Sequence, residues 1–130
     1  APAEYIPPDF PFDWARRTLE QYLGIRHFYE GDFYPLTPYS QANDVWMAYQ
    51  LDRPDLNQGL IVALRRPASN FEVARFPLCG LKQNATYLVT DLDSGKTEEL
   101  SADMLVNRGL RVSIESKPGS ALLRYQKLGN

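Results

Sequence analysis

The chain has 130 residues, of which 44% are hydrophobic and 23% are charged, and its formal net charge is −2. This size and composition are those of one ordinary globular domain, and the charge provides no broad basic surface for nucleic acid. Because no apolar run approaches the roughly 20 residues of a membrane-spanning helix, neither nucleic acid nor a membrane is expected as a partner.

The first 30 residues are predicted to form an extended arm and one linker helix. Four prolines within residues 1–11 prevent a regular helix there. Asp13 is the expected helix N-cap, and Gly24 is expected to weaken or end the helix. One apolar stripe follows helical spacing: Ala15, Leu19, Tyr22 and Leu23. Since one helix cannot bury such a stripe alone, we expect the sandwich or a second copy of the chain to cover it, which makes a homo-oligomer through the helix a candidate assembly.

From about residue 31 onward, the sequence predicts β-structure. Residues 45–52 and 110–115 alternate in side-chain character, as half-buried antiparallel strands do. Further strands are predicted over LIVALRR, FEVARFPL, ATYLVTDL, residues 96–100 and ALLRYQKL, with turn signals at Asp93-Ser94-Gly95 and Pro118-Gly119. The expected fold is therefore mainly β: an antiparallel β-sandwich of seven to eight strands in residues 31–130, preceded by one N-terminal α-helix in residues 1–30.

The alternation also predicts which side chains form the core. In residues 45–52, one face carries Val45, Met47, Tyr49 and Leu51, and the other carries Trp46, Ala48, Gln50 and Asp52. The expected core of the whole sandwich is Val45, Met47, Tyr49, Leu60, Val62, Leu64, Leu110, Val112, Ile114, Leu123 and Tyr125.

Few residues could carry chemistry. His27 and Cys79 are the only residues of their kinds, so they identify neither a catalytic triad nor a zinc site. The lone cysteine excludes an internal disulfide framework and leaves the cellular compartment open. Residues 91–102 begin like a calcium loop but lack its glycine and terminal glutamate at the required positions, which favours a hairpin turn. We therefore predict no catalytic residue, no metal ligand and no cofactor.

The segment FYEGDFYPLTPYS, residues 28–40, contains five aromatic rings and two prolines. Aromatic rings can stack on sugar faces, so Trp46, Tyr39 and Tyr34 are candidate carbohydrate contacts. By the two-residue period of a strand, however, Trp46 and Tyr49 lie on opposite faces, so at least one of them is expected in the core. We therefore interpret residues 28–40 as a structural joint, with rings that fill the corner between helix and strands and prolines that fix the direction of the turn.

Four short motifs, taken in order, resemble the C-terminal part of glycoside hydrolase family 36 α-galactosidases. They are WMAYQ (residues 46–50), RRP (65–67), YLVTD (87–91) and SAL (120–122), within a resemblance that extends over residues 13–128. The resemblance implies an antiparallel sandwich that follows a catalytic (β/α)8 barrel. The two catalytic aspartates of such enzymes would lie on the barrel upstream, so no catalytic residue is carried over to this chain.

Two functions are therefore considered. The preferred one is a non-catalytic C-terminal accessory domain of an α-galactosidase-like glycoside hydrolase, whose partner is the catalytic barrel that it supports by packing. The alternative is an autonomous carbohydrate-binding module that uses exposed aromatic rings. Activity of the chain by itself is not expected on either hypothesis.

Overall fold

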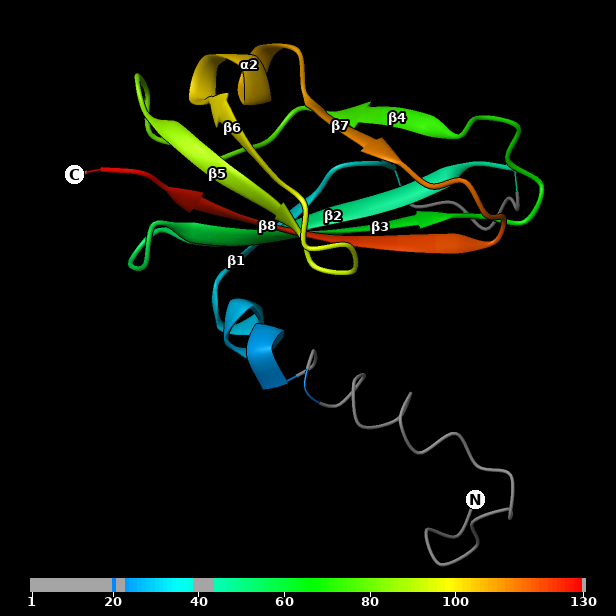
Figure 1. Cartoon of the computed structure of the whole chain (residues 1–130), viewed down its shortest axis with the longest axis horizontal. Helices are drawn as coiled ribbons and strands as arrows, with labels where there is room; N and C mark the ends of the chain where they lie inside the picture. Colours follow the sequence, from blue (N-terminus) through cyan, green and yellow to red (C-terminus); the bar gives the residue numbers. More distant parts are fainter. Residues whose placement is uncertain (1–19, 21–22, 39–43, 130) are drawn as a thin grey trace, which may run out of the picture.

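The computed structural model describes residues 20, 23–38 and 44–129, which form two antiparallel sheets (Figure 1). The larger sheet has the order β1-β2-β3-β8-β5-β6, and the smaller one pairs β4 with β7. The strands are β1 (Asp32–Pro35), β2 (Trp46–Arg53), β3 (Gln58–Arg65), β4 (Val73–Phe76), β5 (Thr86–Asp91), β6 (Thr97–Ser101), β7 (Leu110–Ser113) and β8 (Gly119–Lys127). A 3-10 helix, η1 (Arg26–Glu30), precedes β1, and a helix α2 (Ala102–Asn107) joins β6 to β7.

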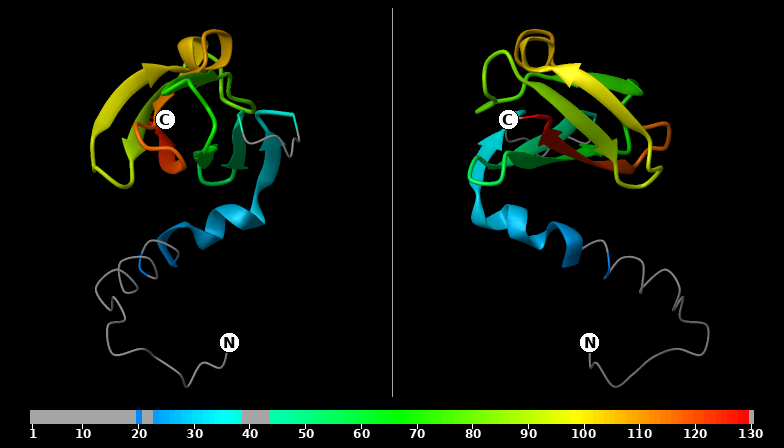
Figure 2. Two further views of the ribbon diagram at one scale, coloured as in Figure 1. Left: turned by 90° about the vertical axis from the view of Figure 1, so that its right-hand side faces the viewer. Right: turned by 60° about the vertical axis from the view of Figure 1, so that its left-hand side comes forward.

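The two sheets form the layers of a sandwich. β4, β7 and α2 lie on one side of the large sheet, and η1 lies on the opposite side (Figures 1 and 2). β4 ends at Phe76, directly before Pro77, and pairs only with β7, as a proline-bounded edge strand should. The predicted mainly-β antiparallel fold is confirmed.

The predicted hairpin of β5 and β6 is confirmed in detail. The Oδ1 atom of Asp91 accepts hydrogen bonds from the backbone N–H groups of Asp93, at 2.9 Å, and Ser94, at 3.2 Å. Gly95 follows with a φ of 77°, a left-handed conformation that favours glycine. The Asp91 side chain therefore stabilises the turn by accepting hydrogen bonds from the backbone of the turn itself.

Helix α2 was not expected from the sequence. The Ser101 hydroxyl caps it by accepting from the Met104 N–H at 3.1 Å. Within the helix, Ala102 and Leu105 are buried. Gly109, at a φ of 92°, lets the chain turn from α2 into β7. Two buried positions in six residues are too short a signal for a helical period to be recognised.

The helix predicted from Asp13 falls largely outside the described residues, as do Asp13, Ala15, Leu19 and Tyr22. Within the described part, residues 23–25 are helical and Gly24 does not interrupt them. The helix continues as η1, and its backbone closes at Gly31, whose N–H donates to the Phe28 carbonyl at 3.0 Å. Leu23 is exposed, and cover of the apolar stripe stays a prediction.

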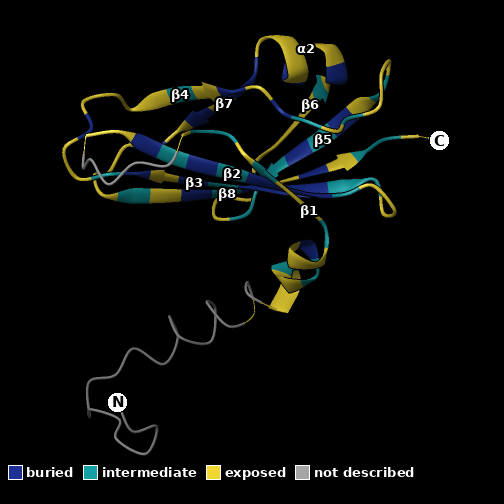
Figure 3. Ribbon diagram, turned by 180° about the vertical axis from the view of Figure 1, so that it is seen from behind, coloured by how far each residue is buried: buried dark blue, intermediate teal, exposed yellow. Residues whose placement is uncertain are grey.

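The main core lies between the two sheets (Figure 3). For β7 and β8 the predicted inner side chains are confirmed: Leu110, Val112, Leu123 and Tyr125 are buried in it, as is Ile114 just after β7. For β2 and β3 the predicted face is wrong. Trp46 and Ala48 of β2 and Ile61 and Ala63 of β3 point into the core instead.

The residues expected there from β2 and β3 lie on the outer side of the large sheet. Val45 and Leu64 are exposed, and Met47, Tyr49 and Val62 are half-buried. Leu60 is buried, but in a second cluster with Phe28 and Leu51. The physical reason is that both faces of these strands carry large apolar residues, so alternation alone does not select the inner one.

Candidate functional site

The inner face of β2 contains a buried polar cluster. The Gln50 side-chain amide donates to the Cys79 carbonyl at 2.8 Å and to the Tyr125 Oη at 2.7 Å, and its oxygen accepts from the Cys79 N–H at 2.8 Å. Tyr125 in turn donates to Asp52 Oδ1 at 2.5 Å. Gln50 thus holds the residue 79 backbone much as a neighbouring strand would, and it joins β2 to β8.

Each member of this cluster has a partner, which favours a structural role. Among the described residues, the only buried side-chain nitrogen or oxygen without a hydrogen bond is Arg65 Nε. Burial raises the pKa of Tyr125, and its bond to Asp52 raises it further. Burial also raises the pKa of Asp52, and the bond from Tyr125 opposes that shift. A cluster that holds Tyr125 protonated and fully bonded stabilises the fold.

The titration of Asp52 leads to a testable pH dependence. A raised pKa means that the folded state holds the proton more tightly than the unfolded chain does. The contribution of Asp52 to the free energy of unfolding therefore falls as the pH rises from 3.8, the ordinary pKa of the group, to the raised pKa. Asp52→Asn removes the titration and keeps an oxygen acceptor for Tyr125. We expect the unfolding free energy of the variant, minus that of the wild type, to increase over this interval in urea melts. Glu98→Gln, at an exposed position, is the control. A difference that is independent of pH would contradict the assignment.

The exposed side of the large sheet carries an apolar hollow of about 280 Å³. We call the surface around it the outer surface. It is lined by Phe33, Pro35, Thr37, Met47, Ala48, Tyr49, Val62 and Leu64. Strands β1, β2 and β3 bring these residues together through their register, in which Pro35 pairs with Tyr49 and Tyr49 with Val62. Nearly all of this lining is apolar, which is unusual for a solvent-exposed sheet face.

Aromatic rings border the outer surface. The ring centroids of Phe33 and Tyr49 lie 5.4 Å apart, and the hydroxyls of Tyr49 and Tyr29 form a hydrogen bond of 3.0 Å. Phe33 is 59% exposed. Partial burial, followed by the bond to Tyr29, raises the pKa of Tyr49 to about 12. The Tyr49 hydroxyl is therefore neutral at physiological pH, and the exposed Phe33 ring is open to a binding partner.

Helix η1 covers the neighbouring part of the same sheet face. Phe28 is completely buried there against Leu51 and Leu60. Arg53 of β2 donates to the His27 carbonyl at 2.6 Å and forms an ion pair with Asp55 at 2.8 Å. His27 stacks on Phe28, with ring centroids 4.0 Å apart. These contacts attach η1 to the outer side of the large sheet.

Of the three predicted carbohydrate contacts, the structure describes Trp46 and Tyr34. Trp46 is only 9% exposed and its Nε1–H donates to the Phe71 carbonyl at 2.9 Å, so its ring belongs to the core. Tyr34 is half-buried and pairs in register with Gln50, on the inner face of β1, whereas Tyr39 lies outside the described residues. The exposed rings beside the outer surface are instead Phe33 and Tyr29. Both rings belong to the aromatic segment 28–40, whose pattern does not tell which of its five rings are exposed.

The described residues provide neither a metal site nor a membrane-spanning helix. These residues contain no group of three or more His, Cys, Asp or Glu side chains that could hold a metal ion. Their helices are also too short or too polar to cross a membrane.

Comparison with solved structures identifies chains of the same fold, whereas no protein-family model and no curated sequence matches the chain. α-Galactosidase AgaA of family GH36 from Geobacillus stearothermophilus, in complex with raffinose, has a TM-score of 0.72 and 21% identity over 89% of this chain. AgaB from the same organism has a TM-score of 0.69 and 21% identity over 89%. The galactosidase domain of the α-galactosidase–sucrose kinase AgaSK has a TM-score of 0.68 and 18% identity over 87%.

The match involves only a small part of each enzyme, because this chain spans 15% to 16% of the length of those three chains. The resemblance seen in the sequence motifs is thus confirmed as a resemblance of fold. The chain has the antiparallel β-sandwich fold of a segment that makes up about one sixth of these GH36 α-galactosidases.

Proposed function

We propose that the chain is a non-catalytic accessory sandwich of a glycoside hydrolase of the α-galactosidase type, and that it supports the catalytic barrel by packing. The outer surface is the observation that carries this proposal. An apolar hollow bordered by exposed rings, on a sheet face that η1 covers only in part, suits contact with another folded domain. η1, which precedes the sandwich in the chain, lies on the same side of the sheet as the outer surface (Figure 2).

The proposal includes the domain boundary predicted from the sequence. Residues 1–30 are assigned to the linker and residues 31–130 to the sandwich. The buried Phe28 and the bond from Arg53 to the His27 carbonyl support a joint that holds the end of the linker against the sandwich. A docked linker would restrict how the sandwich can sit on the barrel, which reduces the entropy that packing must overcome.

A carbohydrate-binding module suits the outer surface less well. Its exposed rings favour sugar stacking, but sugar hydroxyls also need polar partners. Only Thr37 and Tyr49 supply polar side-chain atoms to the lining of the hollow. The Thr37 hydroxyl already accepts from the Ala48 N–H, and the Tyr49 hydroxyl is bonded to Tyr29. The lining therefore favours apolar side chains of a protein partner.

The test compares the isolated chain with the complete product of the open reading frame that encodes it. We expect a barrel upstream, α-galactoside hydrolysis by the complete protein and none by the isolated chain. Leu64→Lys should leave the isolated chain within about 0.5 kcal/mol of wild type, because Leu64 is 43% exposed. In the complete protein, where the charge would be buried, it should lower the apparent Tm by about 3 °C or more.

Phe71→Lys is the matched control, because Phe71 is exposed in the β3–β4 loop away from the outer surface. It should change neither protein. The proposal fails if no barrel is encoded upstream, if Leu64→Lys affects both proteins equally, or if the isolated chain hydrolyses aryl α-galactosides through one of its own carboxylates.

A further inference from the structure

Two arginines face each other on the outward side of the small sheet. Arg75 of β4 and Arg111 of β7 are direct partners in the antiparallel register, and both are exposed. Their neighbours in the strands, Phe76 and Val112, point into the core, so the arginines point away from it. Side chains directly opposite each other in such a pair have Cβ atoms only about 4.5 to 5.5 Å apart, close enough for both guanidinium groups to contact the same acidic group.

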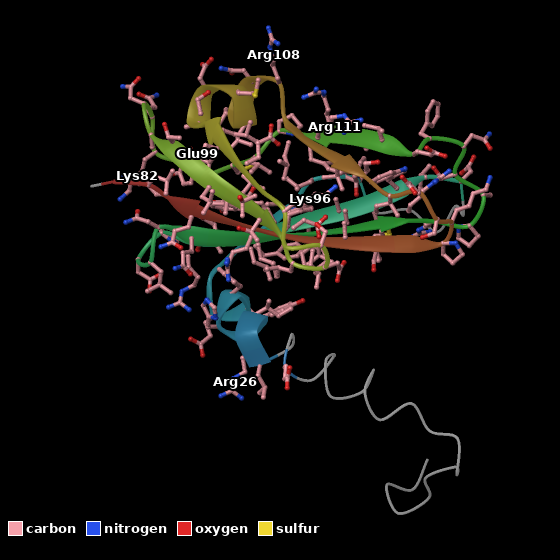
Figure 4. The ribbon with its side chains drawn as sticks, viewed as in Figure 1. Arg26, Lys82, Lys96, Glu99, Arg108 and Arg111 are labelled. Carbon is pink, nitrogen blue, oxygen red and sulfur yellow. The ribbon has the colours of Figure 1, made fainter. Side chains whose placement is uncertain are left out.

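A third arginine extends this basic surface. Arg108 follows α2 directly and is exposed, and the Nη1 atom of Arg75 donates to the carbonyl of Gly109 at 3.3 Å. Figure 4 shows Arg108 and Arg111 on the upper side of the molecule, beside α2 and β7, whereas Arg26 lies on the opposite side. We call Arg75, Arg108 and Arg111 the arginine surface.

The positive charge of the arginine surface is not compensated within the described part of the chain. Arg53 pairs with Glu30 and Asp55, whereas no ion pair of Arg75, Arg108 or Arg111 is found among the described residues. The nearest acid along α2, Asp103, accepts instead from the Asn107 amide at 2.6 Å. Like charges directly opposite each other destabilise a sheet, and the structural contact seen for the pair is the bond from Arg75 to the Gly109 carbonyl.

The shape and surroundings of the surface indicate what kind of anion it suits. The hollow beside α2 is lined by Asn84, Asp103 and Val106 among others but by none of the three arginines, so a small enclosed anion is not favoured. Val73, Met104 and Val106 are exposed on the same strands and helix. Arginine and methionine are both enriched at protein–protein interfaces.

We propose that the arginine surface docks a carboxylate-bearing protein surface. Guanidinium groups pair with carboxylates in a planar, bidentate geometry, and the exposed apolar side chains would pack around those pairs. Nucleic acid is disfavoured because the chain has a net charge of −2 and the basic surface is limited to three residues. The proposal is independent of the barrel contact, since the arginine surface lies on the opposite side of the domain from the outer surface and η1 (Figures 1 and 4).

The test titrates the chain with a hexaglutamate peptide at low ionic strength and follows the NMR signals of the arginine Nε–H groups. We expect the signals of Arg75, Arg108 and Arg111 to shift together and to saturate. The Arg75→Gln/Arg111→Gln double variant should bind about fivefold more weakly or worse, the scale expected for the loss of two exposed charge pairs. Salt at 0.5 M should abolish most of the binding.

The matched control is Arg26→Gln/Arg124→Gln, which removes two exposed arginines elsewhere. Equal weakening by this control would show general attraction and overturn the proposal, as would tighter binding of an oligothymidine or saturation of the same signals by an equal concentration of sulfate. Arg111→Gln should melt no lower than the wild type at low salt, because it removes the repulsion. A lower melting temperature would assign the pair a structural role and also overturn the proposal.

Discussion

Replacing Gly59 with alanine is expected to destabilise the domain by about 3 kcal/mol or more. A Cβ atom at this position of β3 would lie 2.0 Å from both the Cζ and the Oη of Tyr125, far inside van der Waals contact. Tyr125 is 1% exposed and its hydroxyl bonds to Gln50 and Asp52. The ring therefore cannot move aside without breaking the buried polar cluster.

Urea unfolding followed by circular dichroism would measure this loss. Gly24→Ala is the matched control, because nothing lies within 4 Å of a Cβ at residue 24 and the backbone there is helical. It should be neutral or stabilise the domain by up to about 1 kcal/mol. A loss below about 1 kcal/mol for Gly59→Ala would show that the domain can shift Tyr125 at little cost, and the close fit between β3 and β8 would be disproved.

The second large effect is expected for Leu123→Ala, which should cost about 2 to 5 kcal/mol. Leu123 is 8% exposed, belongs to the main core and pairs in register with Ile61 of β3. Its removal would leave a cavity between the sheets that the surrounding strands cannot fully close. The same urea melts provide the measurement.

Leu64→Ala is the matched leucine for this experiment. The sequence alternation placed both leucines in one core, but Leu64 is on the outer surface and 43% exposed. In the isolated chain its truncation should therefore cost less than about 1 kcal/mol. Similar losses for Leu64 and Leu123 would contradict the assignment of faces on β3.

The strands and turns were predictable because their signals are local. The alternation of residues 110–115, the proline after Phe76 and the Asp93-Ser94-Gly95 turn each act within a few residues, and each feature appears where it was expected. The order of short motifs likewise predicted a fold that solved structures confirm. Local signals also predicted that Trp46 and Tyr49 lie on opposite faces of one strand, which the structure bears out.

The sequence by itself determined which residues of β2 share a face, but the tertiary structure decided which face is buried. A strand that is apolar on both faces gains almost the same free energy from burying either face. In β2, the polar residues Gln50 and Asp52 indicated that their face would be exposed, but that face is the buried one. Burial of that face leaves Gln50 with a partner, because its side-chain amide donates to the hydroxyl of Tyr125, which is 75 residues further along the chain. The outer surface and the pairing of Arg75 with Arg111 also depend on strand register. Register between distant strands is set by the packing of the whole sandwich, so no local pattern in the sequence specifies it.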